Sequence, residues 1–261
     1  MMEQDNRTLD LKRVQRLLLR MAKDVTGVLE RHNIPYMMAY GTLIGSLRHK
    51  GFLPWDADFD LLLFNDTYDE ALRWLRAELP PSLFVEDALS EPLYFHEWAH
   101  VKDLNTVAYC DQYPQDGAYA HKGVSIDLYR ITRMKKRDVP GYLNEQNRLY
   151  IERRREKGLM SDEEYARRME TLHRNEASVP PPEEGDDRDV FARVTTYKCK
   201  FWEIGDILPV RKYVFEDTEF YGPHDADAML RKIFGDYMQL PPAEQQVPQY
   251  SAVDFLEDAR N

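Results

Sequence analysis

Apolar residues recur at helical spacing through residues 9–31, and this pattern predicts an amphipathic helix. The short apolar run at 36–40 predicts a buried strand, and Gly41 then allows the backbone to turn sharply into a short helix over 43–47. A second apolar run at 59–64 predicts another strand. This alternation of strands and helices indicates a mixed α/β core.

The middle of the chain continues the mixed pattern. Residues 67–78 have a helical pattern, and Val, Ile, Tyr and Thr are frequent in strands predicted near 83–86, 99–110 and 123–131. The predicted fold class is therefore α/β (α+β) with a mixed sheet, rather than a helical bundle.

The second half of the chain changes character at a stretch rich in Arg, Glu and Lys. Residues 142–173 predict two charged helices, with Ser161 and Glu164 as a capping box, and such a pair is most often a solvated insertion. The proline-rich segment 179–187 predicts a flexible linker. Beyond it, the pattern predicts a hairpin over 207–220 and a helix over 224–238. We therefore divide the chain into an N-terminal helix packed on the core (1–35), the core (36–135), a charged helical insertion with its linker (136–190) and a C-terminal part of the same domain (191–261).

The composition is that of a globular, acidic protein. Of 261 residues, 43% are hydrophobic and 31% charged, which is enough apolar surface to form a core. The formal net charge of -11, without a long basic run, argues against binding to DNA or RNA. A nucleotide remains compatible with this charge, because local basic groups and a metal ion can hold its phosphates.

Cysteine usage and hydropathy indicate a compartment for the protein. Cys110 and Cys199 are far apart and form no C-x-x-C pair, which argues against a zinc knuckle or a disulfide framework. The first ten residues are charged and lack the apolar region of a secretory signal, and no stretch has the roughly 20 apolar residues that span a bilayer. We expect a cytoplasmic protein that meets a soluble or membrane-surface acceptor; the oligomeric state is not visible in the sequence.

The densest chemistry lies around Asp58 and Asp60, at the start of the strand predicted over 59–64. Side-chain alternation places both carboxylates on one face, where like charges are unfavourable unless a cation lies between them. Oxygen ligands of this kind suit Mg²⁺ or Mn²⁺. A third acid, Asp127, lies in an apolar strand, where a carboxylate is costly unless it is exposed or paired. Taken alone, an Asp-x-Asp pair is usually a surface or turn feature, and Asp127 alone could cap a strand end.

A candidate anion site lies just before this acidic pair. Gly41 and Thr42 stand at the opening of the predicted short helix, where backbone N–H groups and the helix dipole favour an anion. Arg48, His49 and Lys50 follow closely and could neutralise phosphate oxygens. The sequence therefore predicts one cleft with a metal edge and a phosphate edge.

Several segments resemble the LicD/fukutin family of nucleotidyltransferase-like proteins. Residues 41–48 and 51–60 look like the family signature, and 124–129 is similar to its strand with the third carboxylate. The C-terminal part also matches at Leu208-Pro209, Phe215-Glu216, 230–238 and Pro241. One departure is Ala57, where bacterial members commonly have another Asp; its side chain points to the opposite face from Asp58, so we expect the metal pair to survive.

The resemblance implies a DNA polymerase β-like nucleotidyltransferase core. It also implies transfer of phosphocholine or a sugar or alditol phosphate from a nucleotide diphosphate donor, with CDP-linked donors favoured, to a hydroxyl of a glycan or other acceptor. Asp58, Asp60 and Asp127 would be both catalytic residues and ligands of Mg²⁺ or Mn²⁺. The substrate-binding candidates are Gly41, Thr42, Arg48, Lys50, Lys102, Lys232, Asp236 and Tyr237, the last three because they lie in the matched C-terminal part.

Two alternative functions belong to other classes. His96, Glu97 and His100 fit H-E-x-x-H, the zinc peptidase pattern, which requires a helix. The flanking residues predict turn and strand instead, and a strand would place the two histidines about 13 Å apart, too far for one zinc ion. The other alternative is a catalytically silent relative that acts as a binding or scaffold protein.

Overall fold

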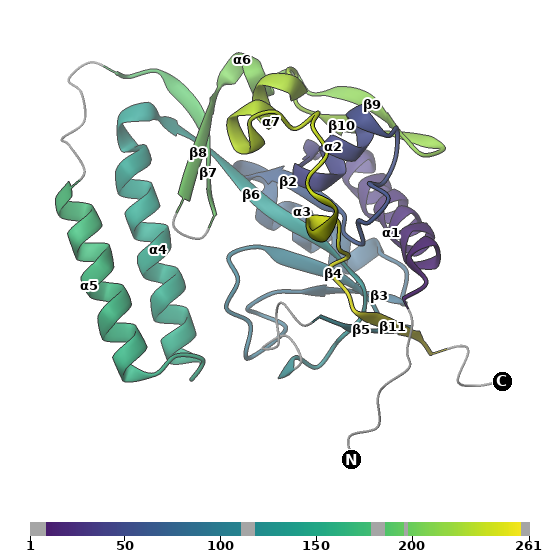
Figure 1. Cartoon of the computed structure of the whole chain (residues 1–261), viewed down its shortest axis with the longest axis horizontal. Helices are drawn as coiled ribbons and strands as arrows, with labels where there is room; N and C mark the ends of the chain where they lie inside the picture. The colour runs from purple at the N-terminus through teal and green to yellow at the C-terminus, as the bar shows by residue number, and fades with distance from the viewer. Residues whose placement is uncertain (1–8, 111–117, 179–185, 196–197, 257–261) are drawn as a thin grey trace.

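The computed structural model describes residues 9–110, 118–178, 186–195 and 198–256 (Figure 1). Its centre is a curled mixed sheet in the strand order β1-β2-β6-β4-β3, with β7 paired to the far end of β6 and β8 paired to β7. Among the strand pairs of this sheet that the structure describes, β2 and β6 run parallel and the others are antiparallel. The predicted mixed α/β class is confirmed. The strands are β1 (Tyr36–Met38), β2 (Asp60–Phe64), β3 (Leu83–Glu86), β4 (Ala99–Asp103), β6 (Ser125–Lys135), β7 (Asp189–Thr195) and β8 (Lys198–Glu203).

Three helices from the first third of the chain pack against this sheet: α1 (Leu11–Arg31), α2 (Tyr40–Arg48) and α3 (Asn65–Glu78). The helix predicted over 9–31 is confirmed, and its apolar face is fully buried from Val14 to Leu29. The strand predicted over 36–40 is shorter than expected because Tyr40, with a φ of 43°, already begins α2. The turn at this point places the start of α2 beside the start of β2.

The strand predicted over 99–110 is two strands separated by a turn. β4 belongs to the central sheet, whereas β5 (Thr106–Tyr109) pairs with β11 (Ala252–Phe255) near the C-terminus. The C-terminal segment runs across one face of the core before it reaches β5 (Figure 1). No strand was predicted at 252–255, and Val247, Gln249 and Tyr250 just before it form part of the wall of the cavity described below.

The charged stretch forms a helical hairpin of α4 (Val139–Glu156) and α5 (Asp162–Ser178), which stands to one side of the sheet (Figure 1). The Ser161 hydroxyl accepts a hydrogen bond from the Glu164 N–H at 3.1 Å, as an N-cap residue does. The hairpin has a small apolar core of its own, made by Ile151, Met160 and Leu172. Most of the predicted linker, 179–185, lies outside the described residues.

The C-terminal part contains the predicted hairpin, formed by β9 (Arg211–Phe215) and β10 (Thr218–Gly222). A one-turn helix, α6 (Ile204–Ile207), precedes it, and α7 (Ala226–Phe234) follows it. The helix predicted over 224–238 ends early because Gly235 has a φ of 72°. Two 3-10 turns complete the described elements, at Lys136–Asp138 and Ala243–Gln245. Within the described residues, no helix has both the length and the apolar character needed to cross a membrane.

Candidate active site

The three predicted acids meet where β2 and β6 lie side by side. Asp60 and Asp127 are direct partners in this parallel pair, and Asp58 lies two residues before Asp60. One carboxylate oxygen from each residue lies within 4.8 Å of the others. We call Asp58, Asp60 and Asp127 the acidic triad; within residues 9–110, 118–178, 186–195 and 198–256 it is the group of acids and histidines close enough to hold a metal ion.

Hydrogen bonds fix the backbone and side chains of this triad. The Asp60 N–H donates to the Thr42 hydroxyl at 2.8 Å, so the start of α2 holds the start of β2. The Tyr129 hydroxyl donates to Asp127 Oδ2 at 2.7 Å, and His100 Nε2 lies 3.3 Å from Asp127 Oδ1. Tyr129 therefore orients the Asp127 carboxylate, and the position of Asp60 depends on Thr42.

The electrostatics of the triad are unfavourable without a cation. Burial, followed by the nearby charges of Asp127 and Asp56, raises the pKa of Asp58 well above its usual value. Burial and the Asp58 charge raise the pKa of Asp60 in the same way, and the opposing effect of Arg193 is smaller. Burial also raises the pKa of Asp56 to about 6. A divalent cation would relieve this repulsion, and an all-oxygen set suits Mg²⁺ or Mn²⁺.

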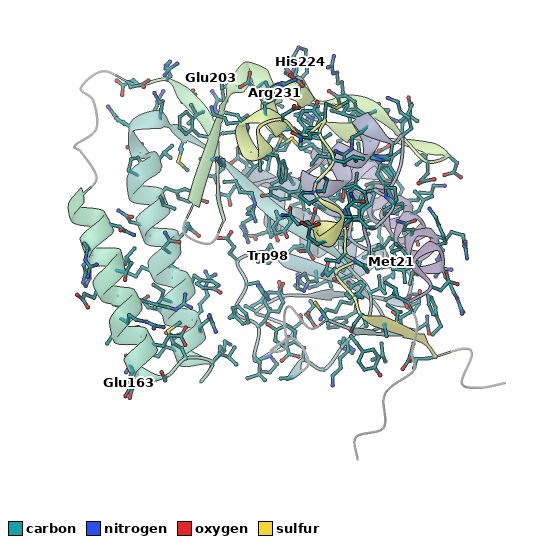
Figure 2. The ribbon with its side chains drawn as sticks, viewed as in Figure 1. Met21, Trp98, Glu163, Glu203, His224 and Arg231 are labelled. Atoms are coloured by element: carbon teal, nitrogen blue, oxygen red, sulfur yellow. The ribbon has the colours of Figure 1, made fainter. Side chains whose placement is uncertain are left out.

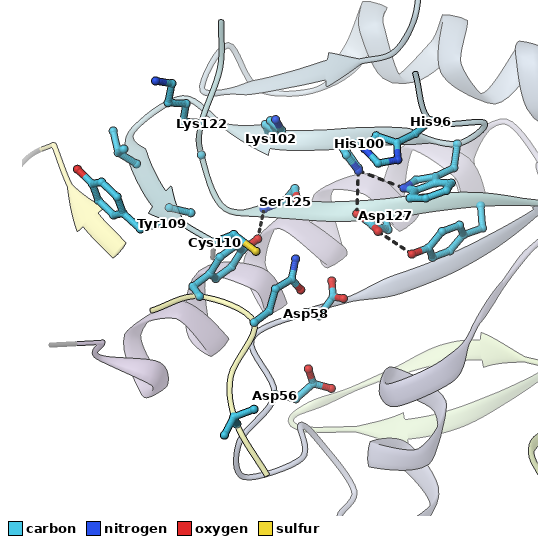
Figure 3. A pocket seen from close by; sticks show the side chains of 18 of the residues that line it. Asp56, Asp58, His96, His100, Lys102, Tyr109, Cys110, Lys122, Ser125 and Asp127 are labelled. Atoms are coloured by element: carbon cyan, nitrogen blue, oxygen red, sulfur yellow. Dashed lines mark hydrogen bonds and ion pairs between the residues drawn. The ribbon is translucent and has the colours of Figure 1, made fainter. Parts of the chain in front are cut away.

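A cavity of about 730 Å³ opens beside the triad. Asp56 and Asp58 lie toward one side of it, and Lys102 and Lys122 lie on another, with Asp127 between them (Figure 3). The cavity therefore combines a cluster of acids with two ammonium groups, as a site for a bound cation and a phosphate-bearing ligand requires.

Comparison with known proteins agrees with this geometry. Residues 33–112 match the family described as LicD/FKTN/FKRP, nucleotidyltransferase domain. This part of the chain is therefore similar to a LicD-type nucleotidyltransferase domain. Over 263 residues it is 24% identical to the lipopolysaccharide cholinephosphotransferase LicD of Haemophilus influenzae, an alignment that covers 93% of this chain and 96% of that protein. Uncharacterised proteins of Rickettsia prowazekii and Rickettsia typhi are each 37% identical over 49 residues, or 19% of this chain and 18% and 16% of their own lengths.

The predicted family resemblance is thus confirmed, and the chain is a distant homologue of LicD over most of its length. The matched domain contains Asp58 and Asp60, while Asp127 lies beyond its end. The pairing of β6 with β2 brings Asp127 to the LicD-type domain.

Lys102 belongs to a buried charge network at the wall of the cavity. Its ammonium lies 2.7 Å from Glu86 Oε2 and donates to the His121 carbonyl at 2.8 Å. Glu86 is fully buried, and its Oε2 also lies 3.3 Å from His100 Nδ1. The network therefore links Lys102 through Glu86 and His100 to Asp127.

Gly41 permits a close approach between α2 and the acidic segment. A Cβ atom at this position would lie 2.7 Å from Asp56 Oδ2, well inside van der Waals contact. The carboxylate of Asp56 thus lies against the first turn of α2, where Gly41 and Thr42 were predicted to bind an anion. In the structure, Thr42 acts on Asp60 through its hydroxyl rather than by lining the cavity.

The other substrate-binding candidates do not line the cavity described by the structure. Arg48 donates to the carbonyls of Tyr237 and Gln239, at 2.7 and 3.3 Å. The Lys232 ammonium lies 4.3 Å from the centre of the Phe201 ring. Lys50 and Asp236 are exposed, and the buried Tyr237 donates its hydroxyl to Asp227 at 2.9 Å. Their roles in substrate binding stay predictions.

Sequence reasoning missed several residues at the cavity. Asp56 and Lys122 each adjoin a segment that was singled out, so proximity in sequence was a usable signal. Arg193 had no such signal: it is buried, donates to the Tyr40 hydroxyl, and its guanidinium lies 4.1 Å from the centre of the Tyr129 ring. Its positive charge opposes the rise in the pKa of Asp60 and so partly offsets the repulsion within the triad.

The H-E-x-x-H pattern is not a helical zinc site. His96 and Glu97 lie in the loop before β4, and His100 lies within β4. The expected separation of about 13 Å was wrong, because the loop is not extended and the two imidazole centres are only 5.5 Å apart. Glu97 pairs with Arg193 at 3.2 Å instead of standing between two metal ligands.

Proposed function

We propose that this protein is a metal-dependent transferase with a DNA polymerase β-like core. It would move a phosphate-linked group, such as phosphocholine or a sugar or alditol phosphate, from a nucleotide diphosphate donor to an acceptor hydroxyl. The single observation that carries this proposal is the clustering of Asp58, Asp60 and Asp127, of which Asp58 and Asp127 line a large cavity beside the segment that matches a nucleotidyltransferase domain.

The residues present fit a divalent cation. Asp58, Asp60 and Asp127 offer three carboxylate oxygens within 4.8 Å of one another, in surroundings where uncompensated charge is costly. These three would hold Mg²⁺ or Mn²⁺. When bound, the cation would neutralise charge on the donor diphosphate.

The chain's own side chains account for the remaining requirements. Lys122 places positive charge on the cavity wall, where donor phosphate oxygens need it, while the Lys102 ammonium on the same wall is shared with Glu86. The acceptor hydroxyl oxygen would form a bond to the donor phosphorus as the bond to the nucleoside monophosphate breaks. Asp127 would accept the hydroxyl proton, and the hydrogen bond from Tyr129 would keep its carboxylate in position.

The choice of transferred group rests on similarity to LicD and not on the shape of the cavity. The Haemophilus influenzae relative is a lipopolysaccharide cholinephosphotransferase, so CDP-choline is the first donor to test and a glycan hydroxyl the first acceptor. CDP-ribitol tests the alditol phosphate alternative.

The decisive experiment is calorimetric titration of CDP-choline and CDP-ribitol in Mg²⁺ and then in EDTA. We expect one donor to bind in Mg²⁺ but not in EDTA, and Asp58→Asn to abolish that binding. Glu219→Gln, an exposed acid on β10, is the matched control and should bind as the unmodified protein does. ³¹P NMR would then follow release of CMP after acceptor is added.

The outcomes separate the proposed enzyme from its alternatives. Metal-dependent donor binding without any CMP release would support a silent binding protein. Absence of binding by both donors, or equal binding by Asp58→Asn, would contradict the proposed transferase site.

A further inference from the structure

A second cavity, of about 470 Å³, lies directly beside the first. His96 and Trp98 line both cavities, so the two share a wall made by the loop before β4. Within this wall, the Trp98 ring lies 4.9 Å from the ring of Tyr129, whose hydroxyl donates to Asp127. Trp98 Nε1 also donates to His100 Nε2 at 3.1 Å. Aromatic side chains therefore connect the second cavity to the acidic triad.

Three arginines from separate elements line this second cavity, together with the carboxylates Asp69, Asp87 and Glu97. Arg76 comes from α3, Arg130 from β6 and Arg153 from α4. Figure 2 places Trp98 on the side of the core that faces α4. The charged hairpin thus completes a cavity next to the proposed active site, which a purely solvated insertion would not do.

Two of these guanidinium groups are held in fixed positions. Arg130 stacks on Tyr68, 3.7 Å from the ring centre, and donates to Asp69 at 2.9 Å. The side chain of Asp69 is 86% exposed, and solvent screens its charge. Asp69 therefore neutralises the Arg130 guanidinium only in part. Arg76 pairs with Asp87 at the cavity rim. Each guanidinium has five N–H donors, and these contacts use only one or two of them.

The third guanidinium, that of Arg153, has no ion pair with any carboxylate in the part of the chain that the structure describes. The acid that interacts with it electrostatically is Glu97; burial raises the pKa of this acid, and the charges of both Arg193 and Arg153 oppose that rise. Glu97 is already in contact with the buried Arg193, at 3.2 Å. Arg153 therefore faces the cavity with positive charge and donors that a ligand can use.

We propose that the second cavity binds an oxyanion, a phosphate or a carboxylate, carried by the saccharide acceptor. Guanidinium groups recognise both oxyanions through charge-assisted hydrogen bonds. An acceptor anchored there can extend past Trp98 and present a hydroxyl to the acidic triad. This inference rests on the proposed transferase function, because it assigns the acceptor to that reaction.

The test measures binding of small anions to the full chain without donor or metal ion, so it does not depend on the donor titration. Glucose 6-phosphate, glucuronate, inorganic phosphate and neutral glucose are titrated and followed by NMR. We expect glucose 6-phosphate or glucuronate to bind more tightly than glucose or inorganic phosphate. Arg153→Ala should weaken this binding about five- to tenfold. Arg148→Ala, an exposed arginine on the same helix outside the second cavity, should leave it unchanged.

Further variants separate the two sites. Arg76→Ala should also weaken anion binding, which keeps the test decisive if Arg153→Ala does not fold. Asp58→Asn should not change it, although the same variant abolishes donor binding if the transferase proposal is right. Equal affinity for glucose and its phosphate, equal losses in Arg153→Ala and Arg148→Ala, or preference for inorganic phosphate over both sugars would overturn the assignment of an anionic acceptor.

Discussion

Replacing Asp60 by Asn is expected to stabilise the metal-free protein while it removes metal binding. At an effective dielectric constant of about 20, two carboxylates 4.8 Å apart repel by about 3 kcal/mol. Asp58 and Asp127 are partly accessible to water, and raised pKa values reduce the average charge, so only part of this energy is recovered. We expect a gain of about 1–2 kcal/mol, or about 4 °C in Tm for a chain of this size. The backbone N–H of residue 60 still donates to Thr42 in this variant.

Metal binding is expected to reverse the order of stability of the unmodified protein and Asp60→Asn. The unmodified protein should gain about 2.7 kcal/mol when free Mg²⁺ is 100 times its Kd, because the ion binds the folded state. Asp60→Asn has lost one of three carboxylate ligands and should gain much less. The variant would then be the more stable protein in EDTA and the less stable one in Mg²⁺.

Differential scanning calorimetry at pH 7.5, in EDTA and in a Mg²⁺ series, measures the Tm of both proteins without and with the metal ion. Glu219→Gln is the control for loss of one negative charge at an exposed position, and its Tm should follow that of the unmodified protein in both buffers. A lower Tm for Asp60→Asn in EDTA would refute the argument, because it would show that the carboxylate is stabilising without a cation.

Three further predictions follow from other contacts. Lys102→Met should cost about 3–5 kcal/mol in urea unfolding, because the fully buried Glu86 loses an ammonium at 2.7 Å; adding Glu86→Gln should restore most of this, and an additive double variant would contradict it. Gly41→Ala should weaken donor binding with little cost in stability, since its Cβ would meet the carboxylate end of Asp56 at 2.7 Å and shift it, whereas Gly205→Ala, with open space around it, should leave donor binding unchanged. In EDTA, the free energy of unfolding should fall as pH rises above about 4: the folded state, with two raised carboxylate pKa values in the triad, binds more protons than the unfolded state. Saturating Mg²⁺ should flatten this slope, and a slope that is unchanged by the ion would argue against a metal site at the triad.

Local sequence patterns predicted the elements whose stability depends on their own residues. The helix over 9–31 has a continuous apolar stripe, and the strand at 83–86 matches β3 because turn residues bound it on both sides. The acidic triad was also predictable, since side-chain alternation relates Asp58 to Asp60 and the motif resemblance added Asp127. Periodicity did not reveal that 99–110 contains a turn, nor that its second strand pairs with 252–255. That pairing depends on contacts between distant segments.

The wall between the two cavities shows why the remaining part of the site was not predictable. Trp98 lies in a pattern that was weighed as a zinc motif, and Arg153 lies in a helix whose charge pattern predicted a solvated insertion. Both interpretations describe each segment alone. Folding places Trp98 between the cavities and brings the α4 hairpin alongside it, so that Arg153 and Arg130 line one space although they come from different elements. A charge pattern indicates which face of a helix contacts water. Tertiary packing determines whether that face lies in open solvent or lines a cavity beside an active site.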